Sequence, residues 1–252
     1  MEDDALRRRL WEGFASLQTL LGGSSERGDV LRRDGLMASI VPTAPDSPAL
    51  NAAVAIEPAA APPLLAELAE RYAAAGVNRW AIWVDGAARD VVQALRRSHM
   101  GIASASPGMG AEIEALALDL GGADPVPAAS LRTVGRVNDL AYGNVDGRLE
   151  RTLATLPEDA LRAYSADLDG APAAVALALH HGGDCGVSFV ATLPRARRRG
   201  LATSVMRNAL ADAERHGLGS VTLQATELSE RLYAQLGLRR LGTMELWEHR
   251  RR

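Results

Sequence analysis

Apolar side chains recur at steps of three and four along several stretches of the chain, which is the period of an amphipathic helix. The longest of these stretches covers residues 4–21, and Gly22 and Gly23 follow it as stop signals. Similar patterns predict further helices over residues 64–75, 88–97, 134–142, 147–156, 200–216 and 229–236.

Short apolar runs between these helices predict strands. In the first half, two runs between residues 35 and 56 surround a proline-rich connection, and further strands are expected over 80–84 and 111–118. In the second half, glycine-containing turns separate runs at 161–167, 173–180 and 186–193, which predicts an antiparallel meander of three strands. Strands at 220–224 and 239–247 each follow a helix. The pattern therefore predicts a mixed α+β fold, in which helices flank a mostly antiparallel sheet.

Residues 120–127 contain two glycines and two prolines, which is the strongest linker signal in the chain. We therefore predict one domain over residues 1–122 and a second over 128–252. The length of 252 residues agrees with one or two domains.

Composition excludes several classes of protein. The charge balance is 28 − 31 = −3, so no overall positive field is available to hold nucleic acid or an anionic membrane. Every basic residue is arginine, so no lysine can form a Schiff base. We see no signal peptide, no apolar run of membrane-spanning length and no metal-binding motif, and Cys185 is the only cysteine. The sequence thus predicts a cytoplasmic protein without a metal site.

The segment with the most distinctive chemistry covers residues 190–203. An apolar strand enters a loop with four arginines between Arg195 and Arg199, and Gly200 opens the next helix. Free backbone N–H groups and the positive end of the helix dipole would meet at this point, which favours an anion such as a diphosphate. The alternative is a basic turn that only faces water.

The spacing Arg197-x-x-Gly200-x-Ala202 after a strand resembles the pyrophosphate loop of the GNAT acyltransferase superfamily. Downstream, residues 225–238 are similar to the second signature of that family, with polar residues at a helix start, Tyr233 four positions after Ser229, and a closing Leu-Gly-Leu. The two motifs occur in the right order, 27 residues apart from Gly200 to Glu227. The resemblance covers about residues 130–252.

The resemblance implies that acetyl-CoA or another acyl-CoA enters a gap where two strands splay apart, with the thioester oxygen on a strand N–H. It implies a cofactor site made of Val190, Ala191, Thr192, Arg197, Arg198, Arg199, Gly200, Leu201, Ala202 and Thr203. Ser229 would contact the pantetheine or the thiol, and Tyr233 would protonate the leaving thiolate. A phenol of pKa about 10 keeps its proton at neutral pH and suits this task. The alternative for Tyr233 is a core tyrosine.

The amine acceptor and the base that deprotonates it stay open. In relatives, the helix that carries Asn138 and Tyr142 lines the acceptor pocket, so these two residues are candidate substrate contacts. The strand before the phosphate loop has no carboxylate, whereas several relatives have a glutamate there. Asp184, Glu227 or a chain of water molecules could accept the proton instead.

The first half repeats the predicted order of elements, but residues 57–64 have three prolines and no arginine or glycine where a phosphate loop would lie. We therefore hypothesise a tandem GNAT chain whose N-terminal copy is degenerate and completes the acceptor cleft. An unrelated α+β domain is the alternative. The function expected is an acetyl-CoA-dependent N-acetyltransferase, and a non-catalytic CoA-binding sensor or scaffold is the alternative. Oligomeric state is open, a homodimer included.

Overall fold

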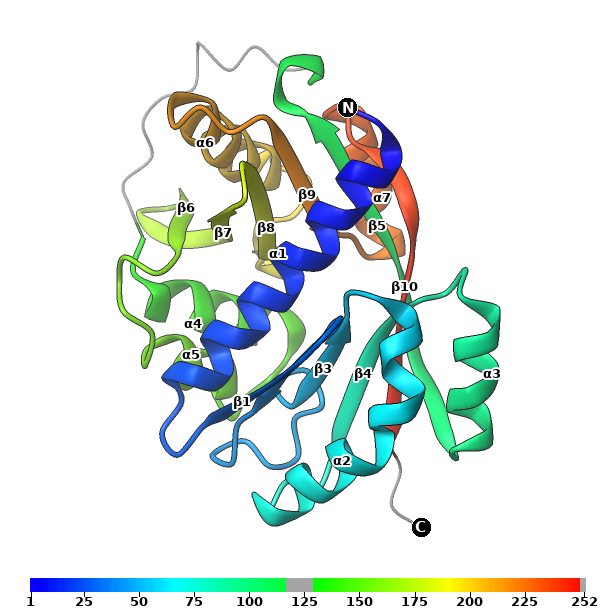
Figure 1. Ribbon diagram of the computed structural model, residues 1–252. Helices are drawn as coiled ribbons and strands as arrows, with labels where there is room; N and C mark the ends of the chain where they lie inside the picture. Colours follow the sequence, from blue (N-terminus) through cyan, green and yellow to red (C-terminus); the bar gives the residue numbers. More distant parts are fainter. Residues whose placement is uncertain (117–128, 250–252) are drawn as a thin grey trace. The chain divides into compact units, whose positions relative to one another are not determined.

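The structure is a computed structural model, which describes residues 1–116 and 129–249. Contacts divide these residues into two compact units (Figure 1). The N-terminal unit consists of Glu2–Gly108, Ala225–Glu227 and the residues from Arg240 to His249, whereas the C-terminal unit consists of Met1, Met109–Gln224 and Leu228–Arg239. The predicted linker and domain boundary lie outside the described residues.

The N-terminal unit is a sheet covered by helices on both faces. Its elements are α1 (Asp3–Ser24), β1 (Asp29–Arg33), β2 (Leu36–Ile40), β3 (Ala52–Ala55), α2 (Ala61–Ala74), β4 (Trp80–Asp85), α3 (Arg89–Arg97), most of β5 (Met100–Glu112) and most of β10 (Arg239–His249). Alternate residues of β4 face opposite sides: Ile82 packs with residues of α2 and α3, and Trp83 packs with residues of α1. Such double burial explains why β4 is apolar along its whole length.

Two strands of this unit differ from the sequence-based expectation. β1 was not predicted, because only Leu31 of its residues is buried and its arginines obscure the apolar pattern. It forms an antiparallel hairpin with β2, in which Gly35 has the positive φ of 69° that the tight turn requires. A strand was expected near 111–118, of which 117 and 118 lie outside the described residues. β5 instead begins at Met100 and ends at Glu112, and a 3₁₀ turn follows at Ile113–Ala115. The pattern was misread there because alternating small and polar residues give β5 little hydrophobic contrast.

The C-terminal unit contains the predicted antiparallel meander. Its helices are α4 (Leu131–Tyr142), α5 (Arg148–Leu153), α6 (Leu201–Arg215) and α7 (Glu227–Gln235) apart from its first residue, and its strands are β6 (Arg162–Leu168), β7 (Ala171–His181), β8 (Asp184–Thr192) and β9 (Ser220–Gln224). β6, β7 and β8 pair antiparallel in sequence order, and β8 pairs parallel with β9 through the α6 crossover. Both α4 and α6 contact β7, and every residue from Ala173 to Ala178 is buried.

The two units repeat one pattern of strand pairing. β1, β2 and β3 pair antiparallel, and β3 pairs parallel with β4 through α2, as β6 to β9 do around α6. Two strands pair with strands from the other half of the sequence. β10, near the end of the chain, pairs antiparallel with β4, and the end of β5 lies next to β9. The mixed α+β fold with helices on the sheet is therefore confirmed.

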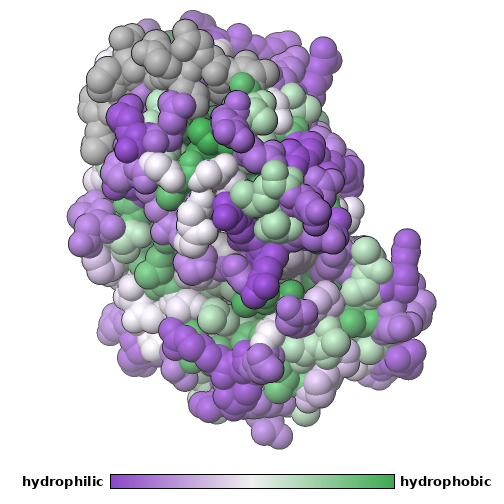
Figure 2. Space-filling view, turned by 45° about the horizontal axis from the view of Figure 1, so that its top comes forward, coloured by the Kyte–Doolittle hydropathy of each residue, from purple (hydrophilic) through white to green (hydrophobic). Residues whose placement is uncertain are grey.

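The face seen in Figure 2 is mostly hydrophilic, with hydrophobic residues in small separate patches, as expected for a surface in contact with water. None of the described helices combines the length and the apolar character needed to cross a bilayer.

Candidate active site

β8 contains a bulge just after the position where it stops pairing with β9. Ala191 pairs with Val175 and Ser188 pairs with Leu177, so Phe189 and Val190 together oppose the single residue Ala176. Phe189 has a positive φ of 52°, which is rare for a residue with a large side chain. The parallel pairing of β8 with β9 ends at Val187, so no described strand pairs with residues 188–192 on that side. The backbone of Val190, Ala191 and Thr192 therefore has an open edge.

The N-terminus of α6 follows this open edge after one turn of 3₁₀ helix. Gly200 is the N-cap residue with a φ of 79°, and among the described residues no side chain caps the helix. The N–H groups of Leu201, Ala202 and Thr203 have no carbonyl within the helix to which they can donate. A Cβ added at Gly200 would meet nothing within 4 Å, so the space around Gly200 itself is open. Such a helix end attracts a negatively charged group.

The arginines of the loop have different surroundings. Arg198 and Arg199 are exposed and form no ion pair with any residue the structure describes, so their charges face solvent beside the helix end. Arg195 lies 3.9 Å from the carboxylate of Asp169. Arg197 instead turns toward the protein: its Nε donates to the Thr192 carbonyl at 3.2 Å and its Nη2 to the Ala141 carbonyl at 3.3 Å. Arg197 thus ties the end of β8 to α4, while its neighbours can bind an anion.

Helix α7 brings the predicted acid and its neighbours together. The phenol of Tyr233 is 4% exposed, and burial raises its pKa well above the usual range. The nearby phenol of Tyr142 adds to this increase, and a hydrogen bond with the Ser229 hydroxyl partly offsets it. Because β8 and β9 are parallel, the starts of α6 and α7 lie at the same edge of the sheet. Tyr233 lies in the last turn of α7 and keeps its proton at neutral pH. Its partner Tyr142 ends α4, the helix that Arg197 ties to the end of β8.

The two candidate substrate contacts have different environments. Tyr142 ends α4 and is exposed, within reach of Tyr233. Asn138 is only 7% exposed, and its Nδ2 donates to the carbonyl of Phe189 at 3.4 Å. That these two residues contact an acceptor stays a prediction.

Asp184 is a buried link between two strands. It is 1% exposed, and its carboxylate accepts hydrogen bonds from Ser220 at 2.5 Å and from Thr222 at 2.6 Å, which joins β8 to β9. It begins β8, so about 26 Å of strand, at about 3.3 Å per residue, separates it from Thr192. Asp184 is therefore not placed to deprotonate an acceptor near the open edge.

Asp184→Asn should lower the stability of the protein without slowing the chemistry. The amide keeps the shape of the carboxylate but leaves one buried hydroxyl without its acceptor, so we expect the free energy of unfolding to fall by about 1–3 kcal/mol. Urea denaturation measures this change, and the rate of the proposed transfer reaction is measured at a temperature where the variant is folded. A large loss of rate at unchanged stability would instead make Asp184 the base.

The lone cysteine and the histidine pair have no role in this site. Cys185 was expected in a turn, but it lies on β8, where burial raises the pKa of its thiol. A thiol in this environment is a poor nucleophile. His180 stacks edge-on against His216 at 5.4 Å between ring centroids. No three metal-ligating side chains of the described chain are grouped so as to hold an ion.

The corresponding helix start in the N-terminal unit cannot offer the same donors. α2 crosses between β3 and β4 as α6 crosses between β8 and β9, but Pro62 and Pro63 occupy its first turn. Proline has no N–H group. The anion site of the C-terminal unit has no counterpart at this position.

Comparison with solved structures gives the class of fold. A GCN5-related N-acetyltransferase from Kribbella flavida aligns with a TM-score of 0.68 and 22% identity over 96% of this chain and 94% of that one. A GCN5-related N-acetyltransferase from Sphaerobacter thermophilus aligns with a TM-score of 0.56 and 12% identity, over 85% of this chain and 80% of that one. A tandem GNAT protein from the clavulanic acid biosynthesis pathway aligns with a TM-score of 0.55 and 14% identity, over 96% of this chain and 94% of that one. The chain therefore has the fold of GNAT proteins.

The comparison of sequences gives the family. Residues 138–238 match the model of the acetyltransferase (GNAT) family. This segment is therefore similar to the GNAT family of acetyltransferases, in agreement with the fold of the solved structures. The segment includes both motifs identified in the sequence. A search of curated proteins found no match.

Proposed function

We propose that the C-terminal unit transfers an acetyl group from acetyl-CoA to the primary amine of an acceptor within a ternary complex. One observation carries this proposal: the uncapped N-terminus of α6, opened by Gly200, lies directly after the unpaired edge of β8. An anion site next to free strand backbone suits a cofactor with a diphosphate at one end and an amide-containing arm at the other.

The bound cofactor would use both features. The N–H groups of Leu201, Ala202 and Thr203 would bind the diphosphate, with the guanidinium groups of Arg198 and Arg199 offsetting its charge. The pantetheine amides would pair with the open edge of β8 at residues 190–192, as an added strand does. A backbone N–H at the bulge would then donate to the thioester oxygen and stabilise the negative charge that develops there.

The transfer needs no covalent intermediate on the enzyme. The neutral amine attacks the thioester carbon, a C–N bond forms, and the tetrahedral intermediate collapses as the C–S bond breaks. The phenol of Tyr233 gives its proton to the departing thiolate, and Ser229, hydrogen-bonded to the phenol, positions that proton. The proton of the amine leaves to water. Cofactor orientation and oxyanion stabilisation supply most of the rate.

Rate should rise with pH if water accepts the amine proton. For an amine of pKa about 10.4, the neutral fraction rises about tenfold per pH unit below that value, so the logarithm of kcat/KM for the amine should rise with a slope of one between about pH 7 and 9. The raised pKa of Tyr233 keeps the acid protonated across this range, so its titration does not reduce the rate. Initial rates with a saturating acyl donor measure the profile. A plateau beginning near pH 7 would reveal a base on the enzyme and contradict this scheme.

Thiol release from acetyl-CoA with a panel of primary amines tests the proposal itself. Release above the uncatalysed rate with at least one amine is the expected result. Saturable binding of CoA without release across the panel would favour a CoA-binding sensor, and the absence of binding would overturn the proposed site.

A further inference from the structure

The bulge of β8 adopts a conformation that the strand would not hold by itself. A residue with a Cβ at positive φ is disfavoured, and Phe189 has no glycine-like freedom. No glycine lies next to it in the sequence Ser188-Phe189-Val190. Contacts outside the strand must therefore stabilise this geometry. The hydrogen bond from Asn138 to the Phe189 carbonyl is such a contact.

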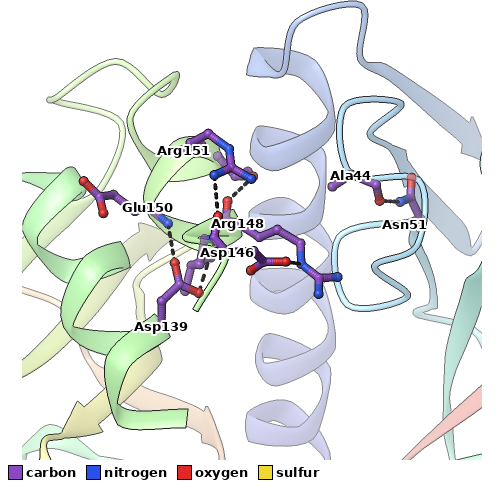
Figure 3. Close-up of polar contacts among 9 residues, drawn as sticks. Ala44, Asn51, Asp139, Asp146, Arg148, Glu150 and Arg151 are labelled. Atoms are coloured by element: carbon purple, nitrogen blue, oxygen red, sulfur yellow. Dashed lines mark hydrogen bonds and ion pairs between the residues drawn. The ribbon is translucent and has the colours of Figure 1, made fainter. Parts of the chain in front are cut away.

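Asn138 is suited to hold the bulge because it is buried on a helix that is itself fixed. The Ser130 hydroxyl caps α4 by accepting from the N–H of Thr133 at 3.1 Å. Asp139 follows Asn138, and its carboxylate accepts from the backbone N–H of Glu150 at 2.9 Å at the start of α5 (Figure 3). A Cβ at Gly135 would meet the Glu150 Cα at 2.5 Å, so the two helices are in close contact.

A second contact joins the same helix to the far end of the open edge. Arg197 donates to the carbonyls of Thr192 and Ala141, so α4 is tied to β8 on both sides of Val190 and Ala191. Asn138 is attached at the strained residue itself, whereas Arg197 is attached after the strand has returned to regular pairing. Of the two side-chain contacts from α4 and the loop, only that of Asn138 is made at the bulge itself.

We infer that Asn138 is a positioning residue, which fixes the Phe189–Val190 bulge so that its backbone N–H groups face the thioester oxygen. This inference rests on the proposed function and gives Asn138 a role other than contact with the acceptor. Loss of the bond should lower kcat, because the oxyanion donor is displaced. Affinity for CoA should change less, because the diphosphate site at the start of α6 contributes to it and does not include the bulge.

Two substitutions and a matched control test this role in the full chain. Asn138→Leu keeps the volume and removes the donor. Asn138→Asp keeps the shape, and its buried carboxyl can donate to Phe189 only while it is protonated. The control is Asn208→Asp, since Asn208 is also buried but donates to the Ser204 carbonyl of its own helix at 2.9 Å.

We expect Asn138→Leu to lower kcat about tenfold with KM for acetyl-CoA within about twofold of wild type. For Asn138→Asp, kcat relative to wild type should rise as pH falls, because protonation restores the donor. For Asn138→Leu the same ratio should be flat with pH. A purely structural defect would not give these two different profiles. Wild-type kcat in Asn138→Leu, or parallel pH profiles of the two variants, would overturn the inference.

Hydrogen exchange separates this inference from the proposed function. In free Asn138→Leu protein, the amides of residues 188–192 should exchange about five- to tenfold faster than in wild type or in Asn208→Asp, the change expected for loss of one hydrogen bond. If wild type releases no thiol, the proposed function fails. The exchange result then decides alone whether Asn138 holds the bulge, and unchanged exchange overturns that role.

Discussion

Gly200→Glu is expected to weaken the binding of CoA at least about a hundredfold while the protein stays folded. The carboxylate would stand in front of the uncapped N–H groups of α6, where the positive helix end favours an anion, so it would compete with the diphosphate and repel it. A hundredfold loss corresponds to about 2.7 kcal/mol. Isothermal calorimetry with CoA measures the affinity, and thermal unfolding monitors the fold.

Gly217→Glu is the matched control for this substitution. Gly217 follows the other end of α6, has a φ of 68°, and offers the same open space around an added Cβ. Both variants therefore carry the same backbone strain and the same added charge, and only one carries them at the proposed anion site. Similar affinities for CoA in the two variants would remove the start of α6 from the cofactor site.

The sequence predicted those parts of the fold whose signals are local. Helices α2, α4 and α6 each show a stripe of apolar residues with a glycine close after the end, and the turns at Asp169 and Gly182 mark the hairpins of the meander. The stripe of α1 was also recognised, but its expected stop at Gly22 and Gly23 was wrong, because the helix continues through both glycines to Ser24. The geometry on which the proposed anion site rests was predictable for the same reason. A strand, a basic loop and a glycine at a helix start are adjacent in the chain, so their spacing alone places them together.

The parts that the sequence did not predict depend on contacts between distant residues. β10 was correctly expected to be a strand, but nothing in its own residues shows that its partner is β4, more than 150 residues earlier. The end of β5 lies next to β9 in the same way. Pairing across such separations is decided by the packing of the whole sheet and not by local propensity.

The bulge of β8 is the functional feature that sequence reasoning missed. Glycine, asparagine or aspartate usually marks a left-handed residue, but a phenylalanine adopts this conformation here. The only trace in the sequence is Asn138, 51 positions earlier, which was identified as a substrate contact and not as a partner of the strand. Strain held in place by tertiary contacts leaves no local pattern.

Tyr233→Phe is expected to lower kcat about a hundredfold and to change the affinity for CoA less than about threefold. Phenylalanine fills the same buried space but has no proton to give to the thiolate, and general acid catalysis commonly contributes at least this factor. The phenol is suited to the task because burial raises its pKa and Ser229 holds its oxygen. Steady-state rates with acetyl-CoA, together with calorimetry of CoA, separate loss of the acid from loss of the cofactor site.

Tyr164→Phe distinguishes catalysis from packing. Tyr164 is also a buried tyrosine of the C-terminal unit with a raised pKa, but its phenol donates to Asp212 at 2.8 Å, on β6 and away from the open edge of β8. Its loss should cost about 1 kcal/mol of stability, as one hydrogen bond does, and leave kcat near the wild-type value. If both variants lose stability alike and neither loses rate, Tyr233 is a core residue, and the thiolate must take its proton from water. If only Tyr233→Phe slows transfer, the proton comes from the phenol in the last turn of α7, and the open edge of β8 and the acid together form the reaction centre.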